Sequence, residues 1–181
     1  GVGNTTNYYY PMKIRGINNS AEPLSNIVEV SAGESYTLAV DGDGNAYGWG
    51  LNSNGQLGVG NTTQYNYPIQ LKGLNNVDTL TGVSKIYASN THSVAVLETG
   101  EVYSWGYNNR GQLGIGSTTQ YTYTMQVKGV GNTGTLTNIK SASLGIYHTI
   151  ALDNDGNVYS WGYNNRGQLW IGSTTQYTYP M

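Results

Sequence analysis

The stretch "YSWGYNNRGQLGIGSTTQYTY" at residues 103–123 returns almost unchanged as "YSWGYNNRGQLWIGSTTQYTY" at residues 159–179. The two copies differ at a single position, where Trp170 stands in place of Gly114. A segment repeated this closely indicates that the chain is built from copies of one structural unit, each of which packs on its neighbour.

The repeat has a period of 56 residues and occurs three times. The landmarks that keep this spacing are Trp49, Trp105 and Trp161; Gly55, Gly111 and Gly167; and Tyr36, His92 and His148. The N-terminal segment is offset by one further residue, since Pro11 and Pro68 lie 57 apart. We therefore predict a single repeat domain over residues 1–181, with repeats at about 1–57, 58–113 and 114–169, and with 170–181 starting a further repeat phase.

Each copy contains the pattern of a β-hairpin. The segments "TLAVDGDGNAYGWG", "SVAVLETGEVYSWG" and "TIALDNDGNVYSWG" each read as an apolar strand, a turn with glycine, and a strand in which Tyr and Trp alternate with small residues. A further β-rich stretch precedes each hairpin, and a Tyr/Thr segment able to form another strand follows it. No stretch has the apolar stripe of an amphipathic helix. The sequence predicts an all-β fold of antiparallel propeller blades.

The same residues resemble a known family. The pattern H-T-x-A-L-x-x-D-G-x-V-Y-x-W-G-x-N-x-x-G-Q-L-G-x-G, almost whole over residues 148–169 and 92–116, is similar to the repeat of the regulator of chromosome condensation family. The chain departs from it at Tyr36, at Thr99 and at Trp170. The resemblance implies a β-propeller, commonly of seven blades, that serves as a binding platform. Members of that family include a guanine-nucleotide exchange factor on chromatin and a bacterial secreted inhibitor of β-lactamases.

Three blades do not close a propeller, which typically has four to eight. Three explanations stay open: a fragment or processed piece of a longer propeller, two copies in a six-bladed ring, or an open head-to-tail assembly. The segments 1–12 and 170–181 occupy the same phase of the repeat, so one copy could hand a strand to another. Trp170 should not fit a position where the pattern has glycine, and it either contacts another chain or reflects drift.

Composition excludes several function classes. Charged residues make up 10% of the chain, with a formal charge of −2 and no basic run, which argues against a nucleic-acid partner. No apolar run is long enough to span a membrane, and no signal peptide is visible. The chain has no cysteine, 17 tyrosines, four tryptophans and no phenylalanine. Aromatic side chains with a polar group are typical of binding surfaces.

No residues with catalytic, metal or cofactor chemistry stand out. "DGDGN" at residues 41–45 starts like a calcium loop, but its twelfth position is Asn52 instead of glutamate. "GVGNTG" at residues 129–134 has the spacing of a dinucleotide loop, but no helix is expected after it. His92 and His148 share a repeat position with Tyr36, which favours packing roles. We predict no enzyme, no cofactor and no metal site.

Partner binding is expected where the repeats differ and face outward. One candidate region is the divergent stretch before each hairpin, residues 20–35, 77–91 and 133–147. The other is the loop after each Trp-Gly pair, because Tyr and Arg dominate binding hot spots. Its candidate residues are Tyr107, Asn108, Asn109 and Arg110, then Tyr163, Asn164, Asn165 and Arg166, together with Trp170. We expect the blade scaffold to be held by Trp49, Trp105, Trp161, His92, His148, Gly55, Gly111 and Gly167.

The sequence favours a noncatalytic propeller that binds protein partners or copies of itself, as a homo-oligomer or filament. A carbohydrate-binding propeller is the alternative, because Tyr, Trp and Asn can stack on sugars and hydrogen-bond to them. An exchange factor or a protein inhibitor would follow only from the family resemblance. Low charge and a surface rich in Tyr, Asn and Thr favour a bacterial secreted or cell-surface protein.

Overall fold

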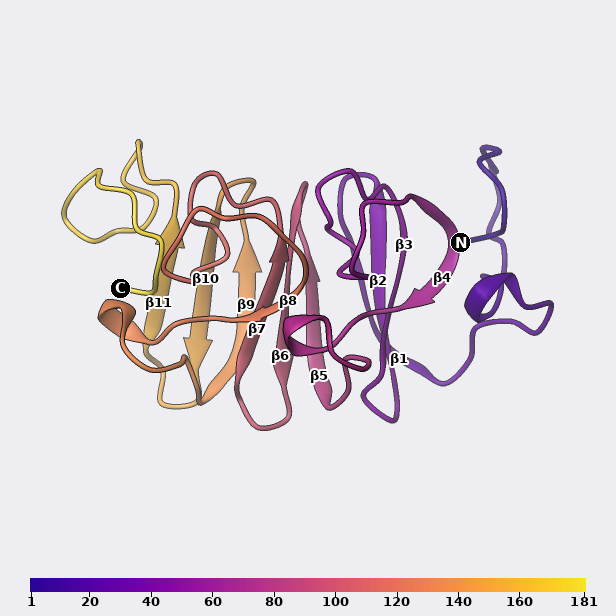
Figure 1. The fold of residues 1–181 in the computed structure, drawn as a ribbon, viewed down its shortest axis with the longest axis horizontal. Coiled ribbons are helices and arrows are strands. Elements are labelled where there is room, and N and C mark those ends of the chain that lie inside the picture. Colours follow the sequence, from indigo (N-terminus) through magenta and orange to yellow (C-terminus); the bar gives the residue numbers. More distant parts are fainter.

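The computed structural model describes residues 1–181 and contains three antiparallel sheets in a row (Figure 1). The first, blade 1, has the strand order β1-β2-β3-β4, and the second, blade 2, the order β5-β6-β7-β8; the third, blade 3, has the order β9-β10-β11. The strands of blade 1 are β1 (Ile27–Ala32), β2 (Tyr36–Asp41), β3 (Ala46–Gly50) and β4 (Tyr65–Gln70). Those of blade 2 are β5 (Val83–Ala88), β6 (His92–Leu97), β7 (Val102–Gly106) and β8 (Tyr121–Gln126), and those of blade 3 are β9 (Ile139–Leu144), β10 (His148–Asp153) and β11 (Val158–Gly162).

The prediction of all-β propeller blades is confirmed. Helical structure is confined to three short 3₁₀ turns, η1 (Ile17–Asn19), η2 (Leu74–Asn76) and η3 (Val130–Asn132). The third of these lies in the "GVGNTG" segment, and the stretch that follows it forms strand β9, so that segment has no dinucleotide-binding geometry. No helix of the structure has the length and apolar character needed to cross a membrane.

The hairpins have the same register in all three blades. Thr37 lies opposite Trp49, Ser93 opposite Trp105, and Thr149 opposite Trp161. The turn glycines Gly44, Gly100 and Gly156 have φ angles of 78°, 80° and 91°, in the left-handed region that other residues avoid. The repeated sequence therefore forms a repeated hairpin, because strand alternation and turn chemistry are both local properties.

The sheets do not coincide with the repeats of the sequence. Strands β1 to β3 come from the first predicted repeat and β4 from the second, and β8 likewise comes from the third, so both four-stranded sheets run across a repeat boundary. In blade 3 the last residues take the place of the fourth strand. The Gly162 amide donates to the Tyr177 carbonyl at 2.7 Å, and the Ser160 and Met181 backbones bond reciprocally.

Each blade has two faces that bury different side chains. We call the face toward the preceding blade the front face and the face toward the following blade the rear face. Between blades 1 and 2, the rear-face residues Leu38, Val40 and Ala46 pack against the front-face residues Val83, Ile86, Ala95 and Trp105. Between blades 2 and 3, Val94, Val96 and Val102 pack against Ile139, Ala151 and Trp161. The hydrophobic core is thus divided into two blade junctions.

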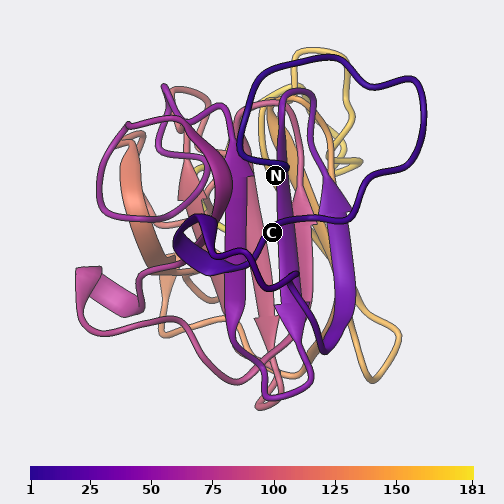
Figure 2. The same ribbon diagram turned by 90° about the vertical axis from the view of Figure 1, so that its right-hand side faces the viewer.

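The N-terminal segment lies over the front face of blade 1. Figure 2 views the molecule from this side and shows the segment in front of the first sheet. Its backbone forms hydrogen bonds with strand β4. The Gly3 amide donates to the Asn66 carbonyl at 2.9 Å. The Asn66 side-chain amide in turn donates to the Gly3 carbonyl at 3.1 Å. Gly1 lies beside Trp49 as Gly58 lies beside Trp105 in the next blade, so residues 1–3 occupy the loop position of a preceding blade.

Candidate partner-binding surfaces

The loops after the Trp-Gly pairs lie along one edge of all three sheets, the upper edge in Figure 1, and the hairpin turns lie along the opposite edge. Each loop is closed by a buried asparagine. The Asn108 side-chain amide donates to the Ser117 and Thr119 carbonyls, and its oxygen accepts from the Leu113 amide at 2.9 Å. Asn164 makes the equivalent bonds one blade further. Both asparagines are fully buried, so their expected role in partner contact is corrected to holding the loop.

The other residues of these loops remain on the surface. Asn109, Arg110, Asn165 and Arg166 are exposed, and Tyr107 and Tyr163 are partly exposed. The Arg110 guanidinium carbon lies 4.9 Å from the centre of the Tyr163 ring, a cation–π contact between the loops of blades 2 and 3. These side chains form a continuous polar and aromatic rim that spans the blade boundary, and a partner could contact it without disturbing the sheets.

The tryptophans join the blades through one carbonyl group in each junction. The Gln56 carbonyl accepts from Trp105 Nε1 and from Ser93 Oγ, both at 2.8 Å. The Gln112 carbonyl likewise accepts from Trp161 Nε1 and from Thr149 Oγ1, both at 2.9 Å. Because the indole is fully buried in both junctions, each bond fixes the ring as well as satisfying a buried donor.

The position shared by Tyr36 and His92 forms a second polar connection between blades. The Tyr36 hydroxyl lies 2.8 Å from Ser93 Oγ and donates to the His92 carbonyl at 2.7 Å. In the next junction, His92 Nε2 lies 3.1 Å from Thr149 Oγ1, and its Nδ1 lies 3.0 Å from Ser89 Oγ.

Burial governs the protonation of these groups. It lowers the pKa of His92 to about 3, with a smaller contribution from the charge of His148, and it raises the pKa of Tyr36. Burial also lowers the pKa of His148, which is half-buried. His92 is therefore neutral near pH 7, with both ring nitrogens engaged, and acts as a packing and hydrogen-bonding residue.

A glycine lies against each buried indole. A Cβ atom on Gly58 would lie 2.8 Å from Trp105 Nε1, and one on Gly114 would lie 2.6 Å from Trp161 Nε1. Both glycines have a φ angle of 69°. The loop glycines Gly55 and Gly111 are restricted by backbone of the next blade, since a Cβ there would lie 2.7 Å from Thr122 Cα and 2.8 Å from Thr178 Cα. At Gly167 nothing lies within 4 Å.

Trp170 takes the third position of this glycine series. It keeps the left-handed conformation, with φ of 51°, and its amide donates to the Gly167 carbonyl as the Gly114 amide donates to Gly111. Its side chain is 95% exposed, because no following blade packs here. The loop backbone is therefore unchanged, and only the surface that it presents differs.

The front face of blade 1 is an apolar surface with a hollow. Val30 is 66% exposed, whereas its counterpart Ile86 in blade 2 is 1% exposed. A cavity of about 640 Å³ lies here, lined by Lys13, Ile14, Glu22, Pro23, Leu24, Ser25, Ile27, Val30, Ala39 and Trp49. Strands β2 and β3 fill the corresponding place in the junction between blades 1 and 2. The divergent stretch 20–35, which the sequence predicts as a partner-binding region, supplies the part of this lining from Glu22 to Val30.

The rear face of blade 3 is open as well. Val158 is 63% exposed, although its counterpart Val102 is fully buried between blades 2 and 3. Ile150 and Leu152 occupy the places of Leu38 and Val40 and are partly exposed. The molecule thus presents a front face at one end and a rear face at the other.

Aspartates at the tips of two hairpins, Asp41 and Asp153, hold the turns. Asp41 Oδ1 accepts from the Asp43 and Asn45 amides, and its Oδ2 accepts from the Tyr47 hydroxyl at 2.8 Å. Burial disfavours the ionised form, but the bonds from Asn45, Tyr47 and Asp43 outweigh it and hold the pKa of Asp41 below its usual value. Burial and the neighbouring Asp41 raise the pKa of Tyr47 to about 12. Asp153 repeats the arrangement in blade 3.

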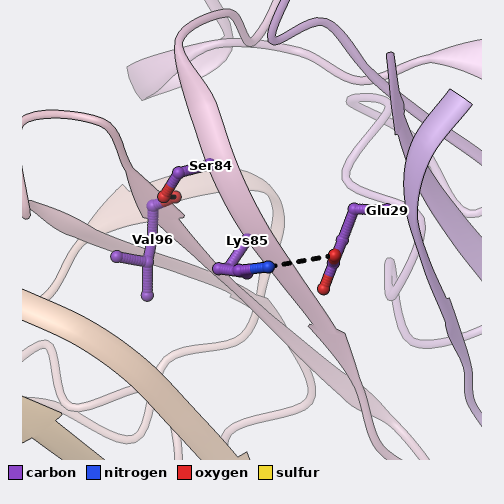
Figure 3. Close-up of polar contacts among 4 residues, drawn as sticks. All are labelled: Glu29, Ser84, Lys85 and Val96. Carbon is purple, nitrogen blue, oxygen red and sulfur yellow. Dashed lines mark hydrogen bonds and ion pairs between the residues drawn. The ribbon is translucent and has the colours of Figure 1, made fainter. Parts of the chain in front are cut away.

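An ion pair joins the first strands of blades 1 and 2. Lys85 Nζ on β5 lies 3.2 Å from Glu29 Oε2 on β1 (Figure 3). Asn90 adds a neighbouring bond, donating to Glu34 Oε2 at 2.9 Å. Both contacts lie at the surface, so they align the strands and contribute little to stability.

Sequence comparison agrees with this geometry. The regulator of chromosome condensation (RCC1) repeat matches residues 43–96 and 99–152, and a second form of that repeat matches residues 27–56, 83–112 and 139–168. The Ultraviolet-B receptor UVR8 of Arabidopsis thaliana is 33% identical over 155 residues, which cover 85% of this chain and 33% of the receptor. Protein pim1 of Schizosaccharomyces pombe is 34% identical over 160 residues, covering 83% of this chain and 30% of pim1. The chain spans about a third of the length of these two relatives.

Solved structures show the same fold. Human WBSCR16 aligns with a TM-score of 0.70 at 21% identity, covering 92% of this chain and 43% of that protein. Prp20p of Saccharomyces cerevisiae, a structure described with its binding properties to Gsp1p and histones, aligns with a TM-score of 0.70 at 22% identity. That alignment covers 91% of this chain and 40% of Prp20p.

Proposed function

The chain belongs to the regulator of chromosome condensation repeat family, and from that premise we propose that it is a noncatalytic scaffold that binds protein through its open blade faces. The observation that carries the proposal is the exposure of Val30 on the front face of blade 1, at a position that is 1% exposed in blade 2. An apolar sheet face of this kind is a binding surface in a folded protein. The partner that fits it is the rear face of another RCC1-type blade.

The noncatalytic part of the proposal is supported by the hydrogen bonds that already occupy the titratable groups. Both ring nitrogens of His92 are bonded in a fully buried site, which is closed to a substrate. The carboxylates of Asp41 and Asp153 are engaged by their own hairpin turns. Acid–base catalysis needs such groups free and within reach of a reacting atom.

Protein binding is also supported by the rim of loops. Arg110 and Tyr163 form a contact across blades 2 and 3, and both are residue types common at binding hot spots. Among solved structures of this fold, yeast Prp20 is described with Kap60 bound, so a protein that contains this fold has a protein partner. For this chain we propose that the front face provides the affinity and the rim provides additional selectivity.

Site-specific photo-crosslinking in an extract of the producing cells tests the proposal. A photoreactive benzoylphenylalanine replaces Val30 on the front face or, as the control, exposed Glu98 on a hairpin turn. We expect protein adducts from position 30 alone, with crosslinked peptides from an RCC1-type blade of the partner. Excess unlabelled chain should compete, and the unlabelled Val30→Glu variant should not. Equal adducts from both positions would refute the proposal.

A further inference from the structure

Trp170 stands where both internal junctions need a glycine. We propose that Trp170 prevents blade 3 of one copy, the donating copy, from docking on the front face of blade 1 of a second copy, the receiving copy. The other residues of both faces are arranged to make this head-to-tail junction. The inference rests on the proposed function only in treating blade faces as binding surfaces. It identifies Trp170 as the residue that decides whether copies of this chain stack.

The apolar residues of the two end faces match the internal junctions position by position. On the rear face of blade 3, Ile150, Leu152 and Val158 take the places of Leu38, Val40 and Ala46. On the front face of blade 1, Ile27, Val30, Ala39 and Trp49 take the places of Val83, Ile86, Ala95 and Trp105. Both sets are aliphatic or aromatic, so a second copy would bury the same kind of surface that blades 1 and 2 bury between them.

The polar residues match as well. In both internal junctions, a glutamine carbonyl accepts from a tryptophan of the next blade and from a serine or threonine hydroxyl. Gln168 stands in the place of Gln56 and Gln112, and the front face of a second copy offers Trp49 and Thr37 as the two donors. His148 stands in the place of His92, which contacts the hydroxyl of Thr149. Its counterpart in the second copy is Thr37.

The N-terminal segment supplies what blade 3 lacks within residues 1–181. The internal junctions are closed from the side by Leu71 and Leu80, and by Val127 and Leu136, all nearly or fully buried. No counterparts follow in blade 3, but Ile14 and Leu24 of a second copy hold the same repeat positions and line its front-face hollow. The Leu24 amide donates to the Ile14 carbonyl as the Leu80 amide donates to the Leu71 carbonyl. Met12 and Met181 share a repeat position, so Lys13 of the second copy occupies the repeat position directly after Met181 of the first.

Residues 1–12 of the receiving copy and 170–181 of the donating copy compete for one place. Residues 4–12 are exposed and are attached mainly through the Gly3–Asn66 bonds. Residues 177–181, by contrast, pair with β11, and the Thr178 carbonyl also accepts from the Gly116 amide at 2.8 Å. The receiving copy would therefore release its own segment. Trp170 then takes the place of Gly1 against Trp49.

A tryptophan at position 170 is sterically incompatible with this junction. A single Cβ atom on Gly58 or Gly114 would already approach the facing indole nitrogen to 2.8 or 2.6 Å, below the distance of real contacts. The indole cannot move away, because its nitrogen bonds to the glutamine carbonyl. A whole indole on Trp170 extends the overlap, so the glycine requirement excludes it.

Sedimentation velocity and light scattering on the purified chain of residues 1–181 test the inference, comparing the wild type with Trp170→Gly and Trp170→Ala. The Ala variant is the matched control, because it removes the exposed indole and keeps the Cβ atom that obstructs the junction. We expect the wild type and Trp170→Ala to stay at the monomer mass of 19.5 kDa. Trp170→Gly should reach at least twice that mass, increasing with concentration.

A second variant identifies the interface. Adding Val30→Glu to Trp170→Gly places a charge on the receiving front face and should return the protein to the monomer, while circular dichroism shows that it stays folded. The inference is overturned if Trp170→Gly remains monomeric, if Trp170→Ala associates equally, or if Val30→Glu has no effect. Because only purified protein is used, none of these results depends on the cellular partner sought by crosslinking.

Discussion

At the residue scale, one backbone position has opposite roles within the same chain. Gly58 and Gly114 combine a left-handed backbone with contact against a buried indole, so two independent constraints demand glycine. Trp170 adopts the left-handed backbone at the cost of strain. The contact constraint does not apply to it, because no indole faces it in this structure. Identical loops can therefore tolerate very different residues, depending on what packs against them.

Two glycine substitutions separate these constraints. Gly114→Ala should lower the free energy of unfolding by about 2–4 kcal/mol, because the left-handed conformation and the overlap with Trp161 both penalise the methyl group. Gly156→Ala is the matched control, since its φ of 91° is also left-handed but nothing lies within 4 Å of the added atom. It should cost about 1 kcal/mol. Urea unfolding followed by tryptophan fluorescence measures both, and equal losses would contradict the packing argument.

His92 should make the stability of the fold dependent on pH. Its pKa is about 3 when folded and 6.5 ordinarily, so below pH 6.5 the unfolded chain binds a proton that the folded chain refuses. The contribution of neutral His92 to the free energy of unfolding is fully present above pH 6.5. It falls by roughly 1.4 kcal/mol per pH unit as the pH decreases toward 3. His148, whose pKa is also lowered, acts in the same direction.

The variant His92→Tyr tests this, because blade 1 already carries Tyr36 at the equivalent position. Through His92, the wild type should lose about 2 kcal/mol of unfolding free energy between pH 6.5 and 4.5. The variant should keep only the smaller dependence contributed by His148. Urea titrations at pH 6.5, 5.5 and 4.5 measure the difference, and parallel slopes for both proteins would show that His92 is not responsible.

At the element scale, the hairpin turns are reinforced differently in different blades. Asp41 and Asp153 each accept bonds from two turn amides and from a tyrosine of the next strand. Blade 2 has Leu97 at the same position and forms the hairpin without this carboxylate. The aspartates therefore strengthen a turn whose shape is set by glycine and strand alternation.

Asp41→Asn should weaken blade 1 without changing its fold. One oxygen becomes an amide nitrogen that faces hydrogen-bond donors, which should cost about 1–3 kcal/mol of unfolding free energy. Asp43→Asn is the control, since Asp43 is exposed and its side chain lies outside this set of bonds, and it should change stability by less than about 0.5 kcal/mol. Denaturant unfolding at pH 7 compares the two. A neutral result for Asp41→Asn would mean that the turn relaxes so that the new amide nitrogen finds hydrogen-bond acceptors.

At the scale of the whole molecule, stability comes from blade junctions that each bury the front face of one sheet. A sheet with one covered side behaves as a unit of a linear array, whose stability sums contributions from its neighbours. The internal junctions are closed on every side, whereas the end faces keep apolar residues in contact with water. Residues at the same repeat position therefore contribute more to the free energy of unfolding in an internal junction than on an end face.

Paired truncations measure this difference directly. Ile86→Ala removes a side chain buried between blades 1 and 2 and should cost about 2–4 kcal/mol. Val30→Ala changes the same repeat position on the open front face and should cost less than about 0.5 kcal/mol. Thermal and urea unfolding provide the measurement. Similar losses at both positions would indicate that the front face of blade 1 is covered in solution.

The loop that follows Trp-Gly shows how far sequence reasoning reached toward the candidate site. Repetition indicated that the loop was important, and Arg110 and Tyr163 do lie on the surface. The same pattern could not distinguish Asn109, which is exposed, from Asn108, which is buried by bonds to residues nine and eleven positions ahead. Adjacent asparagines are alike in composition, and only the path of the loop decides which one turns inward.

The sequence by itself determined the period, the hairpins and the all-β blade, because strand alternation and turn glycines act over a few residues and recur in every copy. Tertiary structure alone decided which side of each sheet is buried, where the apolar hollow lies, and what opposes Trp170. Those features depend on contacts between residues some 50 positions apart in different blades, such as Gln56 with Trp105. Such contacts form when sheets stack, and no local pattern specifies which faces of the stack remain open.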